Sequence, residues 1–165
     1  MFPPALTDRA AALIARYASL GMKIATAESC TGGLVSALLT EIPGSSAVLE
    51  RGFVTYSNAA KHELLGVSLE TLKTHGAVSE ATARAMALGA VAHSQAQVAV
   101  SITGIAGPDG GTPQKPVGLV YFARSGPGHA VVAVERRFGD LGRSGIRRAS
   151  VDEALKLLEH AVLSA

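Results

Sequence analysis

A serine followed by two glycines marks the first candidate site, in the segment from Thr26 to Gly33 that reads Thr-Ala-Glu-Ser-Cys-Thr-Gly-Gly. A strand-like run precedes it and a helix-like run follows, so Ser29 is expected at the carboxyl end of a strand. Unpaired backbone N–H groups and the helix dipole favour a developing negative charge at such a junction. The pattern suits a serine nucleophile with an oxyanion site, or equally a phosphate site. For an isolated motif, a helix-capping serine in a tight turn is the simpler alternative.

A serine hydroxyl needs a base to remove its proton, and Lys61 is the candidate. It lies in Tyr56-Ser57-Asn58-Ala59-Ala60-Lys61, in the first turn of an expected helix. A lysine with the ordinary pKa of about 10.4 is almost fully protonated at pH 7, so burial or a nearby cation must lower its pKa. Tyr56 could orient or relay the proton, whereas a solvated lysine is the alternative for Lys61. Cys30 competes with Ser29 as nucleophile, unless it is a small core residue.

A glycine- and proline-rich stretch runs from Gly104 to Pro116 directly after an expected strand. Its length and composition indicate a loop that surrounds a ligand. It contains neither a Walker A motif nor a GxGxxG fingerprint. Arg143, Arg147 and Arg148 open the last expected helix, where they could bind a phosphate or carboxylate or lie solvated on the surface.

Composition narrows the function classes. The 165 residues carry a formal charge of +2 without a Lys/Arg block, and 4% are aromatic without any Trp, so we expect no nucleic-acid partner. The single cysteine and the spacing of the five histidines predict no metal site. The N-terminal segment lacks the features of a leader and no run is long enough to span a membrane, so we expect a cytoplasmic protein without a membrane partner. The length predicts a single domain over residues 1–165.

Periodicity predicts alternating helices and strands. Helices are expected at residues 5–20, 31–40, 59–65, 80–93 and 144–162, with Asn58 and Ser79 as N-caps of the third and fourth. Strands are expected at 23–28, 48–56 and 97–103, and a hairpin at 117–123 and 130–138. This order predicts an α/β fold: a three-layer α/β/α sandwich around a mostly parallel mixed sheet, with an antiparallel strand in the hairpin near the C-terminal end.

Four segments together resemble the CinA C-terminal domain family: TAESCTGG (26–33), RGFVTYSNAAKHELLGV (51–67), HGAVSE (75–80), and SITGIAGPDGGT with KPVGLVYFA (101–123). The resemblance covers nearly the whole chain after residue 20, in order and with matching spacing. It implies an amidohydrolase that converts nicotinamide mononucleotide and water to nicotinate mononucleotide and ammonia in pyridine nucleotide recycling. It also implies a Ser/Lys mechanism without metal or organic cofactor, and a homo-oligomer, with a dimer as the default.

The family's motif serine, lysine and tyrosine fall on Ser29, Lys61 and Tyr56. Its late Gly-Asp-Arg-x-x-x-Arg pattern is altered here, because Leu141-Gly142 separates Gly139-Asp140 from Arg143. The substrate-binding residues expected from the serine turn, the glycine-rich segment and the last helix are Cys30, Thr31, Gly32, Gly33, Thr103, Gly104, Ala106, Gly107, Thr112 and Arg147. Two alternatives remain: a catalytically silent nucleotide-binding or regulatory module of the same fold, and an amidase that uses Cys30.

Overall fold

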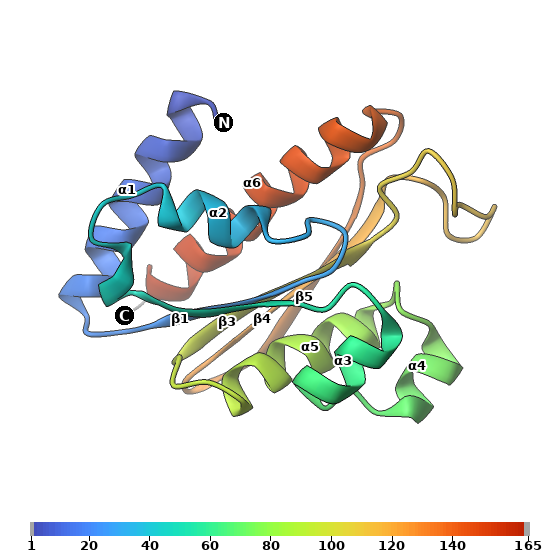
Figure 1. The fold of residues 1–165 in the computed structure, drawn as a ribbon, viewed down its shortest axis with the longest axis horizontal. Coiled ribbons are helices and arrows are strands. Elements are labelled where there is room, and N and C mark those ends of the chain that lie inside the picture. Colours follow the sequence, from blue (N-terminus) through green and yellow to red (C-terminus); the bar gives the residue numbers. More distant parts are fainter. Residues whose placement is uncertain (1, 164–165) are drawn as a thin grey trace.

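A mixed sheet of five strands, in the order β2-β1-β3-β4-β5, organises the computed structural model, which describes residues 2–163 (Figure 1). The strands are β1 (Ile24–Glu28), β2 (Leu49–Val54), β3 (Val98–Gly104), β4 (Leu119–Gly126) and β5 (His129–Arg137). β1 pairs in parallel with both β2 and β3, while β4 pairs antiparallel with β3 and β5. β4 therefore runs against the other four strands, which confirms the mixed, mostly parallel sheet and its late hairpin.

Helices cover both faces of this sheet (Figure 1). One layer contains α1 (Pro4–Ser19), α2 (Leu34–Thr40) and α6 (Gly142–Val162), and the other contains α3 (Asn58–Leu65), α4 (Leu69–His75) and α5 (Glu80–Ala92). A short 3₁₀ helix, Ser45–Ala47, precedes β2. Leu38, Phe122 and Ile146 belong to the apolar core of the first layer, and Leu65 and Met86 to that of the second. The predicted three-layer α/β/α sandwich is confirmed.

The starts of α1, α2, α3 and α6 differ from the prediction by one to three residues, and α4 was not predicted as a helix; the differences at α2 and α3 bear on the site. α2 begins at Leu34 rather than at residue 31, because residues 29–33 form a turn in which Gly32 and Gly33 have φ values of +60° and +98°. The N-cap of α3 is Ser57, whose side chain accepts a hydrogen bond from the N–H of Ala60, and not Asn58. Both residues are good caps, so the sequence alone could not choose between them. The expected cap Ser79 is confirmed by its bond from Thr82 N.

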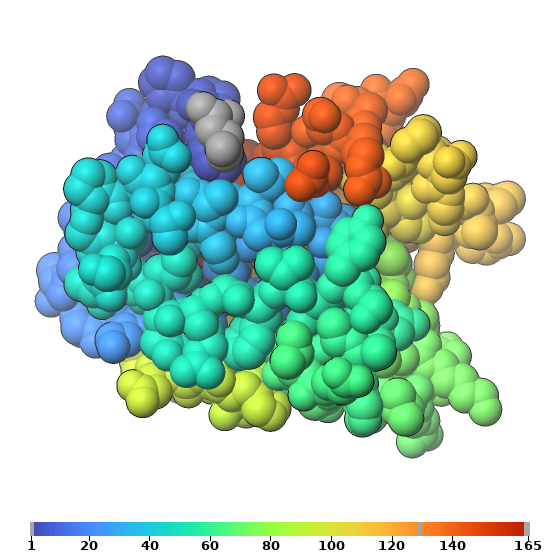
Figure 2. Space-filling model, in the orientation of Figure 1, coloured from blue at the N-terminus to red at the C-terminus, as the bar shows by residue number. Residues whose placement is uncertain are grey.

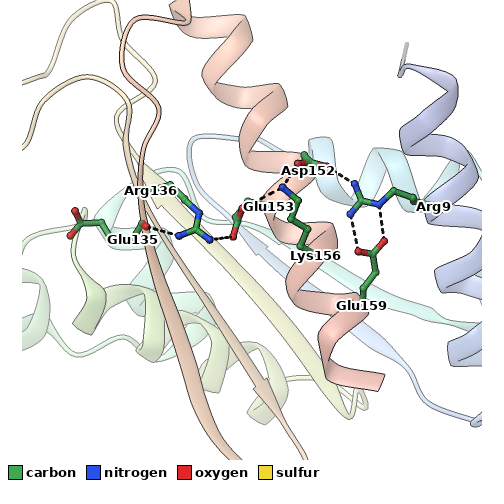
Figure 3. A network of polar contacts seen from close by, with 7 residues as sticks. All are labelled: Arg9, Glu135, Arg136, Asp152, Glu153, Lys156 and Glu159. Atoms are coloured by element: carbon green, nitrogen blue, oxygen red, sulfur yellow. Dashed lines mark hydrogen bonds and ion pairs between the residues drawn. The ribbon is translucent and has the colours of Figure 1, made fainter. Parts of the chain in front are cut away.

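Charged side chains connect α1, β5 and α6 in a network shown in Figure 3. Arg9 of α1 donates to both carboxylate oxygens of Glu159, at 2.9 and 2.8 Å, and to Asp152. Arg136 of β5 donates to Glu153 at 2.8 Å. These contacts hold the C-terminal half of α6 against α1 and β5, and the N-terminal turns of α6, which reach the site described below, lie outside them. No helix within residues 2–163 is long and apolar enough to cross a membrane.

Candidate active site

The structure brings Ser29 and Lys61 into direct contact. Ser29 directly follows β1 and Lys61 lies in the first turn of α3, which follows β2. Because β1 and β2 are parallel neighbours, their carboxyl ends meet at the same edge of the sheet. Nζ of Lys61 lies 3.1 Å from Oγ of Ser29. The side chain of Lys61 is 0% exposed, which excludes a solvated surface lysine.

Two carbonyl oxygens hold the amine of Lys61, those of Thr55 at 2.9 Å and Tyr56 at 3.4 Å. Burial lowers the pKa of Lys61 below its ordinary value. A neutral amine has two N–H bonds and one lone pair. When the two carbonyls accept the two N–H bonds, the lone pair is free to accept the proton of the Ser29 hydroxyl. The contact places an amine that can accept a proton beside a hydroxyl that can lose one.

The turn after Ser29 offers fewer free amides than the sequence indicated. The N–H of Gly33 donates to the carboxylate of Glu28 and the N–H of Gly32 donates to the carbonyl of Ser29, so neither can bind an oxyanion. Over residues 2–163, no oxygen acceptor is found for the N–H groups of Cys30 and Thr31. The expected donor set from Cys30 to Gly33 is thereby reduced to two amides.

Tyr56 reaches the site in a different way from the one predicted. Its side chain is 63% exposed, and its hydroxyl accepts a hydrogen bond from Nη2 of Arg143 at 3.3 Å. The carbonyl of Tyr56, rather than its hydroxyl, contacts Lys61. Nη1 of Arg143 donates to the carbonyl of Gly107 at 2.8 Å. Arg143 thus joins the turn after β2 to the glycine-rich loop, and Figure 2 shows both segments meeting the start of α6 on one face.

Arg147 lies one helical turn after Arg143 and contacts the serine turn. Its Nε donates to the carbonyl of Cys30 at 3.2 Å, and its Nη2 donates to the carbonyl of Thr31 at 3.0 Å. Both arginines therefore reach the site despite the insertion of Leu141-Gly142, but they contact different segments. The backbone contacts of Arg147 fit a residue that holds the turn in place.

A cavity of about 350 Å³ adjoins the glycine-rich loop and the start of α6. It is lined by Ala106, Pro108, Val117, Gly139, Asp140, Gly142 and Arg143. Ser29 and Lys61 do not line it, and Arg143 connects it to their neighbour Tyr56. Asp140 was not among the predicted site residues, although the altered Gly-Asp pattern was a signal for it.

Two predicted binding residues have structural roles. Thr103, buried in β3, donates its hydroxyl to the carbonyl of Ala77 at 2.7 Å and so ties the strand to the segment before α5. Thr112 is exposed in the glycine-rich loop, where its hydroxyl accepts a hydrogen bond from the N–H of Lys115. Thr55 was not predicted as a site residue, because its contact with Lys61 is made by its main-chain carbonyl.

Cys30 is buried, and burial raises the pKa of its thiol to about 11. A thiol with this pKa stays protonated near neutral pH, which makes it a poor nucleophile. Within residues 2–163, no three His, Cys, Asp or Glu side chains come together as a metal site would require.

The chain is similar in sequence and structure to known proteins. A sequence model of the CinA C-terminal domain matches residues 6–162. The CinA-like protein of Anaeromyxobacter sp. (strain K) is 51% identical over 150 residues, which are 91% of this chain. The match spans only 36% of that relative, so the chain covers about a third of the length of such relatives.

Shorter relatives match over most of their length. The nicotinamide-nucleotide amidohydrolase PncC of Escherichia coli (strain K12) is 52% identical over 139 residues, which are 84% of this chain and 83% of that protein. The crystal structure of competence/damage inducible protein CihA from Agrobacterium tumefaciens superposes with a TM-score of 0.96. It is 52% identical and covers 98% of both chains.

Proposed function

The chain belongs to the CinA C-terminal domain family, and from that membership we propose that it is an amidohydrolase that converts nicotinamide mononucleotide and water to nicotinate mononucleotide and ammonia. The PncC relatives, which match over most of their own length, support this substrate. The observation that carries the proposed chemistry is the 3.1 Å contact between the buried amine of Lys61 and the hydroxyl of Ser29.

The proposed reaction begins when Oγ of Ser29 attacks the carboxamide carbon while Lys61 takes its proton. The tetrahedral oxyanion accepts hydrogen bonds from the N–H groups of Cys30 and Thr31. The ammonium of Lys61 then gives its proton to the nitrogen, and the C–N bond breaks to release ammonia. Water attacks the resulting ester as Lys61 takes a proton from it. Return of that proton to Oγ of Ser29 breaks the ester and releases the carboxylic acid, which loses its proton to water to give the carboxylate product.

The nucleotide part of the substrate is assigned to the cavity beside the glycine-rich loop. Arg143 lines this cavity and presents a cation for the phosphate, while the carboxylate of Asp140 can accept hydrogen bonds from the ribose hydroxyls. We therefore assign the phosphate to Arg143, which lines this cavity, rather than to the expected Arg147, which does not line it and contacts the carbonyls of the serine turn. The hydroxyl of Tyr56 holds Arg143 in place.

The experiment that tests this proposal is ammonia release from nicotinamide mononucleotide by the purified chain, with a metal chelator present. Ser29→Ala should lower the rate by at least about 10³-fold, because the nucleophile is lost. Cys30→Ala, checked for folding by circular dichroism, is the matched control one residue away and should retain activity.

Two results would contradict the proposal. Binding of the mononucleotide without ammonia release would make the chain a nucleotide-binding module. Loss of activity in Cys30→Ala with full activity in Ser29→Ala would make it a cysteine amidase.

A further inference from the structure

Glu28 is a fully buried carboxylate that directly precedes the nucleophile. Its two oxygens accept hydrogen bonds from the N–H groups of Gly33, Val35 and Ser36, at 3.0, 3.1 and 2.9 Å. These are amides at the start of α2, which a helix leaves unpaired. The side chain of Glu28 therefore occupies the place at this helix end where a substrate anion would otherwise bind.

A buried charge is strongly unfavourable unless hydrogen bonds compensate it, so this carboxylate and the start of α2 must stay together. The contact closes the chain between Glu28 and Gly33 into a loop that contains Ser29. The main chain of Glu28 also reaches the other half of the site, because its carbonyl accepts the N–H of Thr55 at 2.9 Å. The carbonyl of Thr55 in turn accepts from Lys61. Glu28 thus links the turn that contains Ser29 to Thr55, whose carbonyl holds the amine of Lys61.

We propose that Glu28 is a positioning residue that directs Ser29 towards Lys61 and leaves the N–H groups of Cys30 and Thr31 for the oxyanion. The kinetic part of this inference rests on the proposed amidase function. The structural part, that the carboxylate keeps the serine turn closed, does not.

Glu28→Gln is the informative substitution because it keeps the shape of the side chain. The glutamine has one oxygen acceptor, and its NH₂ group faces backbone donors, so the turn loosens. The nucleotide cavity is lined by other segments. We therefore expect kcat for ammonia release to fall at least about tenfold while KM stays within about threefold.

Cys30 provides a readout that does not depend on activity. It is the single cysteine of the chain, lies in the serine turn and is 5% exposed. Opening of the turn exposes its thiol, so Glu28→Gln should speed reaction with a thiol reagent at least about tenfold. Rates measured at several pH values separate this opening from a change in the thiolate fraction, because the charge of Glu28 also contributes to the raised pKa of Cys30.

Glu153→Gln is the matched control. Glu153 is 7% exposed and bonded to Arg136 in the network of α6 (Figure 3), and its partners Arg136 and Lys156 do not belong to the serine turn. Its substitution should lower the unfolding temperature but leave both kcat and the labelling rate of Cys30 unchanged.

The inference is overturned if folded Glu28→Gln keeps the wild-type kcat and labelling rate. It is also overturned if Glu153→Gln changes both quantities as much as Glu28→Gln does. If Glu28→Gln does not fold, Glu28→Asp takes its place: it keeps the charge on a shorter side chain, and wild-type kcat and labelling in that variant overturn the inference. A wild-type chain without ammonia release refutes the proposed function alone, since the labelling comparison still decides the role of Glu28.

Discussion

Replacing Gly89 by alanine should displace the helix that carries Lys61. Gly89 lies in α5 where the end of α3 crosses it. A Cβ at this position would lie 1.9 Å from the carbonyl oxygen of Leu65 and 2.8 Å from its carbonyl carbon. Leu65 follows Lys61 by four residues, so both side chains project from the same face of α3, and both are buried. The clash is with backbone, and a change of side-chain rotamer cannot relieve it.

The displacement and its cost follow from these distances. To restore an ordinary contact of 3.4 Å, α3 must retreat by about 1.5 Å. Overpacking of this kind costs about 1–3 kcal/mol, and the better helix propensity of alanine returns up to about 1 kcal/mol. Because the contact is with backbone, the upper part of that range applies, about 2–3 kcal/mol, and the net loss after the gain in helix propensity is about 1–2 kcal/mol. This corresponds to a fall in unfolding temperature of about 3–6 °C for a chain of this size. A nucleophile and base separated by a further ~1 Å lose about 10²-fold in kcat.

Two measurements on the same sample test these values. Circular dichroism gives the unfolding temperature, and ammonia release at 25 °C gives kcat. Gly126→Ala is the control, since a Cβ there would meet its nearest neighbour, Cγ2 of Val98, at an ordinary 3.5 Å. It should keep the wild-type kcat. A Gly89→Ala variant with wild-type unfolding temperature and kcat would refute the claim that this contact sets the position of Lys61.

Lys61→Arg should lower kcat about 10²–10⁴-fold, because arginine keeps the charge but cannot act as a base; ammonia release near the wild-type rate would exclude Lys61 from the mechanism. In the wild type, kcat should rise with pH through the lowered pKa of Lys61, since only the neutral amine accepts a proton, and a pH profile that is flat there would contradict this. Cys30→Ala should keep kcat within about threefold, because a buried thiol with a pKa of about 11 is not the nucleophile. Burial alone would raise the pKa of Asp152, but hydrogen bonds from Lys156 and Arg9 hold it below its ordinary 3.8. The stabilisation is therefore present above that value and lost as the pH falls through the lowered pKa, so Asp152→Asn should lower the unfolding temperature at pH 7 by an amount that disappears in acid.

The sequence predicted the sandwich well because its elements are short, periodic and separated by glycine and proline. It also predicted Ser29 directly after one strand and Lys61 in the first turn of the helix that follows the next strand. Their contact follows from a rule of topology, since parallel neighbouring strands end at the same edge of a sheet. Burial of Lys61 could not be read from its surroundings in the chain, because it depends on how α3 packs on α5.

The details of the site depended on tertiary packing. Arg143 and Arg147 are four residues apart and share one face of α6, so spacing alone cannot tell which contacts a ligand. The position of α6 on the sheet decides it, and places Arg143 at the glycine-rich loop and Arg147 at the serine turn. The sequence predicts Glu28 at the end of a strand, and nothing local indicates that its carboxylate folds back onto the start of the helix five residues later.

The two backbone carbonyls that hold Lys61 explain how its amine can both take and return a proton in the proposed reaction. In the neutral state that the proposal requires, the carbonyls of Thr55 and Tyr56 can accept the two N–H bonds, which leaves the lone pair for Ser29. After proton transfer the same carbonyls keep the same two bonds, and the third N–H points to the reacting oxygen or to the departing nitrogen. Neither protonation state requires the side chain to move, so the site avoids reorganisation between steps. The orientation of the base thus depends on main-chain atoms, and substitution of the side chain of Tyr56 should affect the placement of Arg143 rather than proton transfer.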